Sequence, residues 1–208
     1  MIESQYWRAE LRNDLAWLKK HRTYRRWSET QQVLFERKLM LTAFQVRSLL
    51  ERPKVNDRAR STGMSVLRYK KVGDRPFTVT GSGWPHERFD MERPEPAVLS
   101  ALDVCNQLIH YYWMQTWSEG QAFTSMLVFS DYMRHKWAYE FRVADLLQLF
   151  RVFGDDSSAI VGAESEWNEK KQDYVLKKSW GPGDLTANPS IEGMPKRLRL
   201  LRTPHVKR

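Results

Sequence analysis

The sequence predicts an α+β protein that is mainly α, a helical bundle with a C-terminal β-hairpin and a short helix. Three segments carry apolar residues at helical spacing, namely 3–22, 28–52 and 95–118. A later segment, 124–142, is predicted to form two strands around a turn, and residues 137–142 alternate in it as half-buried strands do. Apolar residues make up 41% of the 208 residues, which is enough for a hydrophobic core, so we expect a folded domain.

The first two helices are expected in the N-terminal quarter of the chain. In segment 3–22 the apolar residues share one helix face: Trp7, Leu11, Leu15 and Leu18. The other face is expected to be basic: Arg8, Arg12 and Lys19. Ser28 and Gln31 match a capping box that begins the second helix, which ends before Pro53. That helix is apolar nearly all round, which predicts a central helix covered on several sides.

The segment 53–97 is rich in glycine and proline, which predicts an insertion rather than part of the bundle. Two short runs in it, 65–72 and 77–80, have strand-like composition and indicate a small hairpin. The third helix is then expected over 95–118, with Pro96 in its first turn.

Strands are predicted at 124–130 and 135–142, followed by a short helix at 144–153 that ends at Gly154. We therefore expect one domain over 1–153.

The remaining residues, 154–208, are expected to form a C-terminal appendage. A surface hairpin is predicted around 166–176, because residue pairs of strand-like composition flank a polar turn. The appendage ends in a basic tail, 196–208, which contains no acidic residue.

The net charge of +9 and the isoelectric point of about 9.7 favour acidic partners, and nucleic acid first among them. Two clusters of basic residues are the candidate nucleic-acid-binding residues: Lys19, Lys20, Arg22, Arg25 and Arg26, and then Lys196, Arg197 and Arg199. Tyr24 and Trp27 lie beside the first cluster, and bases stack on such rings. The alternative is a solvated helix end whose positive charge complements the helix dipole.

Several classes of site are not expected. Cys105 is the only cysteine, so neither an intrachain disulfide nor a zinc site of several thiolates is possible. The five histidines are scattered, and we expect no metal site and no cofactor. The N-terminal residues do not resemble a signal peptide and no apolar run is long enough to cross a membrane, so a cytoplasmic protein with no membrane association is expected.

The candidate catalytic residues are Asp103, Asn106 and His110. At three- and four-residue spacing they share one face of the expected third helix. Buried polar side chains need partners, so this polar stripe is either a structural network between helices or a site for a ligand, partner or substrate. Cys105 projects from a different face, together with Leu102, and is expected in the core.

Asn106 and His110 resemble the motif of HEPN-like proteins. Many of these proteins carry an Arg-Asn-x-x-x-His signature and act as metal-independent ribonucleases in toxin and antiviral systems. The resemblance implies that His110 helps to activate the RNA 2′-hydroxyl, in a site that usually forms where two protomers meet. Cys105 stands at the position of the signature arginine, so the cation that stabilises phosphate charge would have to come from elsewhere.

The order of helices and strands also resembles a group of small uncharacterised bacterial proteins, which implies a shared fold and no activity. Three functions remain open. The first is a HEPN-like bacterial accessory protein of a defence or toxin system that binds nucleic acid, RNA more than DNA, or a protein partner. The second is a metal-independent ribonuclease with His110 and Asn106 at a dimer interface. The third is a structural subunit of a larger assembly; a homodimer or a subunit of a complex is expected throughout.

Overall fold

The computed structural model describes most of the chain: residues 4–23, 27–51, 55–78, 80, 84–156 and 162–180. It divides into two compact units, Met1–Ser157 and Ser158–Arg208. The helices are α1 (Ser4–His21), α2 (Glu29–Leu50), α3 (Asp57–Arg60), the short 3-10 helix η1 (Pro85–Glu87), α4 (Ala101–Ile109) and α5 (Val143–Asp155). The strands are β1 (Gly63–Lys70), β2 (Glu95–Ser100), β3 (Tyr111–Glu119), β4 (Ala122–Ser130), β5 (Trp137–Arg142), β6 (Gly162–Asn168) and β7 (Asp173–Trp180).

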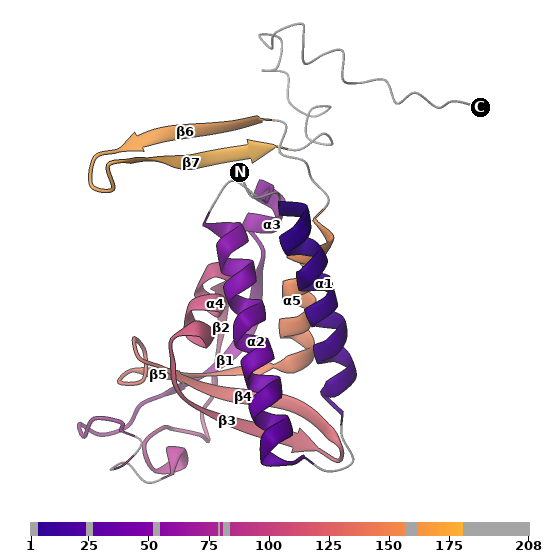
Figure 1. Cartoon of the computed structure of the whole chain (residues 1–208). Helices are drawn as coiled ribbons and strands as arrows, with labels where there is room; N and C mark the ends of the chain where they lie inside the picture. The colour runs from indigo at the N-terminus through magenta and orange to yellow at the C-terminus, as the bar shows by residue number, and fades with distance from the viewer. Residues whose placement is uncertain are drawn as a thin grey trace, which may run out of the picture. The chain divides into compact units, whose positions relative to one another are not determined.

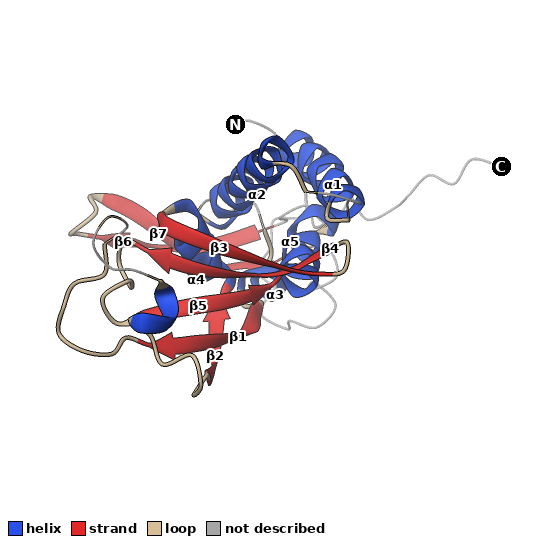
Figure 2. Cartoon of the chain, turned by 90° about the horizontal axis from the view of Figure 1, so that it is seen from below, coloured by secondary structure: helices blue, strands red, loops and turns tan. Residues whose placement is uncertain are grey.

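The first unit is built on a five-stranded sheet in the order β2-β1-β5-β4-β3 (Figure 2). Every neighbouring pair of strands in this sheet is antiparallel. The predicted helical bundle is therefore wrong, and the fold is α+β with a substantial sheet. Segment 53–97, which is predicted as an insertion, contributes β1 and the first half of β2, and β1 lies between β2 and β5.

Helices α1, α2, α4 and α5 form a layer on one face of this sheet (Figure 1). Helices α4 and α5 contact the strands directly, while α1 packs against α2 and α5, and α2 packs against α4 as well. Helix α1 buries Leu11, Leu15 and Leu18 in the main core, as its spacing predicts. Truncation of a core leucine to alanine costs about 2–5 kcal/mol, so this stripe is what holds α1 on the domain.

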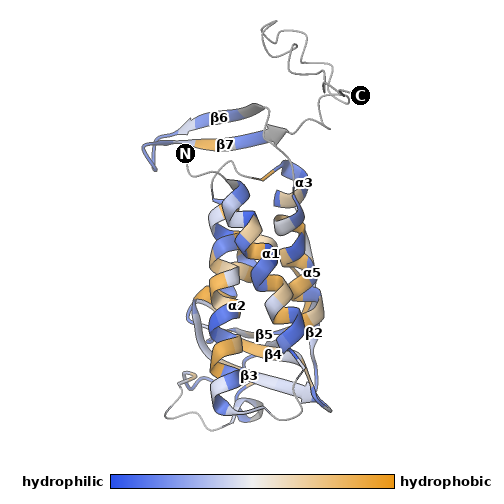
Figure 3. Cartoon of the chain, turned by 45° about the vertical axis from the view of Figure 1, so that its right-hand side comes forward, coloured by the Kyte–Doolittle hydropathy of each residue, from blue (hydrophilic) through white to orange (hydrophobic). Residues whose placement is uncertain are grey.

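Helix α2 begins at the predicted capping box. The Ser28 side chain accepts a hydrogen bond from the Gln31 amide, and the Gln31 side chain accepts one from the Ser28 amide. The prediction that α2 is covered on several sides is wrong, because only one of its faces is buried. Apolar residues run along α2 in Figure 3, and four of them are exposed: Val33, Leu34, Leu41 and Phe44.

The other face of the sheet carries a second, smaller core. The segment between β1 and β2 covers this face, with Phe77 and Phe89 fully buried against it. Phe77 stacks on Phe129 of β4 at 4.7 Å between ring centroids. The sheet is thus covered on both faces, by helices on one and by a long connection on the other.

The predicted helix 95–118 is only partly correct, since α4 occupies its middle and strands occupy both ends. Ser100 accepts a hydrogen bond from the Asp103 amide and so begins α4 at the following residue. Pro96 lies opposite Leu67 in the edge strand β2, where a missing amide proton is tolerated. Helical spacing alone did not reveal these boundaries.

Other predicted elements are confirmed. Helices α1 and α2, strands β4 and β5 and helix α5 lie where they are predicted, within a few residues. In the second unit, β6 and β7 form the predicted hairpin, in which Trp167 and Tyr174 pair across the strands. Of the predicted run 77–80, the described residues are not in a strand.

Candidate nucleic-acid interface

A groove with a volume of about 440 Å³ lies between α1 and α5. Both helices line it: Arg12, Leu15, Ala16, Lys19 and Arg22 from α1 and the residue that follows it, and Ala144, Leu147, Gln148, Arg151 and Asp155 from α5. The residues on α1 recur at three- and four-residue spacing and therefore share one face. Gly154 helps the helices approach, because a Cβ there would lie 3.3 Å from Cγ of Arg12.

The groove is strongly basic, with four cationic side chains and one carboxylate. Arg12 is held in place by a hydrogen bond of 2.6 Å from its Nη1 to the Gly154 carbonyl oxygen. Arg151 pairs with Asp155 at 2.8 Å, but both side chains are at least half exposed, so this pair is weak. The field inside the groove is therefore positive, which attracts phosphate groups.

Only some of the basic residues predicted to bind nucleic acid line the groove. Lys19 and Arg22 line the groove, while Lys20 is exposed outside its lining. The other predicted contacts lie outside the described residues: Arg25, Arg26, Lys196, Arg197 and Arg199.

Arg8 does not belong to the basic face, contrary to the prediction. It is buried and forms an ion pair of 3.6 Å with Asp156. Desolvation lowers the pKa of Arg8, and the neighbouring carboxylate of Asp156 opposes that effect. Arg8 therefore ties α1 to the end of α5 and is not available to a ligand.

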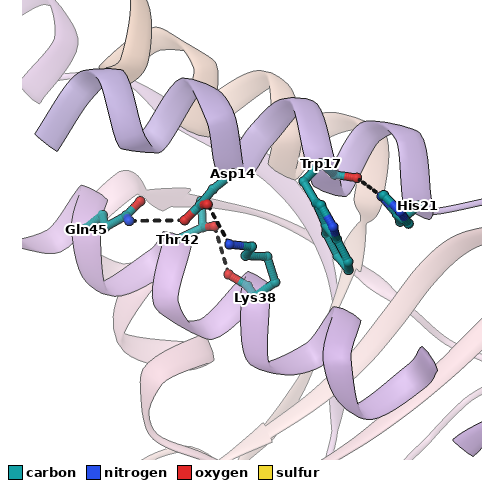
Figure 4. A network of polar contacts seen from close by, with 6 residues as sticks. All are labelled: Asp14, Trp17, His21, Lys38, Thr42 and Gln45. Carbon is teal, nitrogen blue, oxygen red and sulfur yellow. Dashed lines mark hydrogen bonds and ion pairs between the residues drawn. The ribbon is translucent and has the colours of Figure 1, made fainter. Parts of the chain in front are cut away.

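A polar network fixes α1, and so the groove, against α2 (Figure 4). The buried Asp14 carboxylate accepts a hydrogen bond of 2.7 Å from Lys38 Nζ and one of 3.1 Å from Gln45 Nε2. At the end of α1 the rings of Trp17 and His21 stack at 4.1 Å, and His21 Nδ1 lies 2.8 Å from the Trp17 carbonyl oxygen. His21, which lies within the predicted basic cluster, thus has a structural contact.

His110 lies at the C-terminal end of α4, beside a cation from another helix. Its Nε2 lies 3.2 Å from Nη1 of Arg47, which also donates from Nε to Glu51 at 2.8 Å. A guanidinium group has no acceptor, so Nε2 of His110 accepts this hydrogen bond and the imidazole proton is on Nδ1. The ring also contacts Tyr132 edge-on at 5.2 Å.

The other two candidate catalytic residues have different surroundings. Asp103 is exposed, and its carboxylate accepts a hydrogen bond of 2.6 Å from the Ser100 hydroxyl at the start of α4. Asn106 is half-buried, and its backbone oxygen accepts the His110 amide at 3.1 Å. Within the part of the chain that the structure describes, His110 is the one of the three candidate catalytic residues that contacts a cationic side chain, that of Arg47.

Cys105 is fully buried in the main core, as its place on the apolar face predicts. Burial raises the pKa of its thiol to about 12, although the charge of Arg47 partly offsets this. A thiol with such a pKa is protonated at neutral pH and is not a nucleophile.

Two residues of this region were not singled out from the sequence. Arg47 is the third cation of α2, after Arg37 and Lys38, and Arg151 lies on a short helix with no other basic residue in 143–155. A single arginine on a helix is a weak signal, and the contact that makes Arg47 relevant, with His110, joins residues that are 63 apart in the sequence.

Within the described part of the chain, no group of three or more histidine, cysteine, aspartate or glutamate side chains is placed to hold a metal ion. Nor does that part contain a helix of the length and apolarity needed to cross a membrane. Comparisons of the chain with models of protein families, with characterised proteins and with solved structures find no match. Functional inference therefore depends on the chemistry of the groove and of the His110 region.

Proposed function

We propose that this protein binds single-stranded nucleic acid, RNA more than DNA, through the groove between α1 and α5. The observation that carries the proposal is the excess of four cationic side chains over one carboxylate in the lining of the groove. Cations contribute most of the affinity for a phosphate backbone. Arg12 and Arg22 are ten residues apart, which is about 15 Å along a helix, so the groove suits a short stretch of strand.

The preference for RNA is carried by the resemblance of Asn106 and His110 to the HEPN-like motif. A role in a bacterial defence or toxin system is the biological setting that this resemblance implies. We place the protein in the cytoplasm, which the single cysteine of the chain supports.

The test is a double charge reversal in the groove. Lys19→Glu with Arg22→Glu should weaken the binding of a fluorescent single-stranded RNA, measured by anisotropy at low salt. The slope of log affinity against log salt should become shallower by about 1.4, because each lost phosphate contact accounts for about 0.7. Circular dichroism of the variant checks that it remains folded.

The control is Lys170→Glu with Lys171→Glu, which makes the same change in net charge at the exposed turn between β6 and β7. This control should keep the salt slope of the wild type. Equal losses of affinity in both variants would show that net charge, and not the groove, binds the strand.

A second candidate function is metal-independent RNA cleavage at His110. The observation that favours it is that Arg47 Nη1 lies 3.2 Å from His110 Nε2. Arg47 would supply the cation that the HEPN-like signature has at the position of Cys105. In this proposal Arg47 moves from His110 Nε2 to the phosphate, whose negative charge it stabilises. The freed Nε2 accepts the proton of the 2′-hydroxyl as that oxygen attacks the phosphorus and the 5′-oxygen leaves. RNA incubated with protein and a chelator should be cleaved, and both His110→Ala and Arg47→Ala should abolish cleavage. Undiminished cleavage by either variant, or none by the wild type, rejects this candidate.

A further inference from the structure

A second pocket, with a volume of about 110 Å³, lies between the start of α2 and strands β3 and β4. Three aromatic rings in its lining are in mutual edge contact: Trp27, Phe35 and Phe123. The ring centroids of Phe35 and Phe123 are 5.1 Å apart, and Trp27 lies 5.7 Å from each of them. Phe35 and Phe123 are almost fully buried, whereas Trp27 is partly exposed, so Trp27 offers the apolar surface that suits another ring.

The rest of the lining is polar: Gln32, Glu36, Thr116 and Ser118, together with Trp117. Gln32 Nε2 lies 3.0 Å from Glu36 Oε1 and 3.4 Å from Thr116 Oγ1, so its amide is oriented by both. No lysine or arginine in the part of the chain that the structure describes forms an ion pair with Glu36. A half-buried carboxylate beside aromatic rings is a hydrogen-bond acceptor available to a ligand.

The pocket adjoins the basic groove through the main chain. The Phe123 amide donates a hydrogen bond of 2.8 Å to the Arg22 carbonyl oxygen. Phe123 lines the pocket, and Arg22 lines the groove. A strand whose phosphates lie in the groove near Arg22 thus passes close to the pocket.

We propose that the pocket receives one unstacked pyrimidine base of the bound strand and prefers cytosine to uracil. The inference rests on the proposed function of the groove. Bases of single-stranded RNA are commonly turned out and held against aromatic rings. The pocket, at about 110 Å³, is smaller than a cavity of about 150 Å³ that encloses one benzene ring. Its mouth is open, so it suits the inner part of a single ring and not a fused purine.

Glu36 supplies the discrimination between the two pyrimidines. A carboxylate accepts a hydrogen bond from the cytosine N4 amino group. Uracil presents a carbonyl oxygen at the corresponding position, and this second acceptor repels the half-buried carboxylate and gives it no hydrogen bond. The preference for cytosine should be about tenfold, the equivalent of one good charged hydrogen bond.

The experiment compares oligocytidylate, oligouridylate and oligoadenylate of equal length by anisotropy, with wild-type protein and with Glu36→Gln. The wild type should bind oligocytidylate about tenfold more tightly than the other two. In Glu36→Gln this difference should disappear while the salt slope stays unchanged, because the groove is intact. Glu92→Gln is the matched control; it removes the same charge from an exposed position in the connection before β2 and should keep the preference.

Equilibrium dialysis of free cytidine and uridine separates this inference from the function of the groove, because nucleosides carry no phosphate. Cytidine binding that Glu36→Gln removes supports the pocket even if oligonucleotides do not bind. Tight binding of all three oligonucleotides with equal affinity supports the groove and overturns the pocket. Binding of tetramethylammonium without cytidine also overturns it, since the pocket would then be a cation site.

Discussion

Substitution of Asp14 by asparagine tests whether the network between α1 and α2 holds the groove in shape. Asp14 is 6% exposed, and it accepts hydrogen bonds from Lys38 and Gln45. Asparagine keeps the size of the side chain but removes the charge, so the bond from Lys38 is no longer an ion pair. It also replaces one acceptor oxygen with a donor group.

The size of the effect follows from the exposure of the two partners. A hydrogen bond to a charged group contributes about 1.5–3 kcal/mol, and two are weakened here. The Lys38 side chain is 33% exposed and can regain water, which lowers the contribution of that pair. We expect a loss of about 2 kcal/mol in the free energy of unfolding, and a fall in Tm of about 4–8 °C for a domain of this size.

Urea denaturation followed by circular dichroism measures this loss, and the slope against urea should be unchanged. The control is Asp155→Asn, which removes a carboxylate whose side chain is 50% exposed and whose partner Arg151 is 66% exposed. That change should cost less than about 0.5 kcal/mol. If Asp14→Asn costs no more than the control, the network does not stabilise the contact between α1 and α2.

Two further predictions concern the sheet and the core. Gly63→Ala should destabilise the domain by about 1–3 kcal/mol in urea denaturation, because the new Cβ would lie 2.6 Å from the Leu99 carbonyl oxygen in β2. The control is Ser65→Ala, at an exposed position of the same strand, which should change stability by less than about 0.5 kcal/mol. An equal cost for both would mean that strand β2 shifts freely. The Cys105 thiol should resist thiol reagents at about pH 8 until the protein is unfolded. Its pKa is raised to about 12 in the fold, so the unfolded state loses this proton first, and stability should fall by about 1.4 kcal/mol per pH unit above about pH 9. Cys105→Ala should lack that part of the slope between about pH 9 and 10, and identical slopes would contradict the shifted pKa.

Local sequence signals were sufficient where a helix carries its own start and one apolar face. The capping box at Ser28 and Gln31 begins α2 without help from other parts of the chain. The leucines of α1 bury the face that their spacing predicts. Strand-like composition likewise predicted β4 and β5, although alternation is clear only in β5, because residues 126–130 of β4 are buried on both faces of the sheet.

The same signals were insufficient for β3. Residues 111–119 continue the apolar spacing of α4, yet they form a strand paired with β4. A short apolar run fits a buried helix and a buried strand equally well, and pairing with a distant strand decides between them. The predicted bundle failed at this point, since β2 and β3 form both edges of the sheet.

The sequence by itself determined the basic character of the protein, the helices α1 and α2, the buried state of Cys105 and part of the groove, in Lys19 and Arg22. These depend on composition or on residues within one or two helical turns of each other. Only the tertiary structure placed Arg12 beside Gly154, 142 residues later, and Arg47 beside His110, 63 residues later. Such contacts arise from the packing of whole helices and strands, and no local pattern encodes which two surfaces will meet.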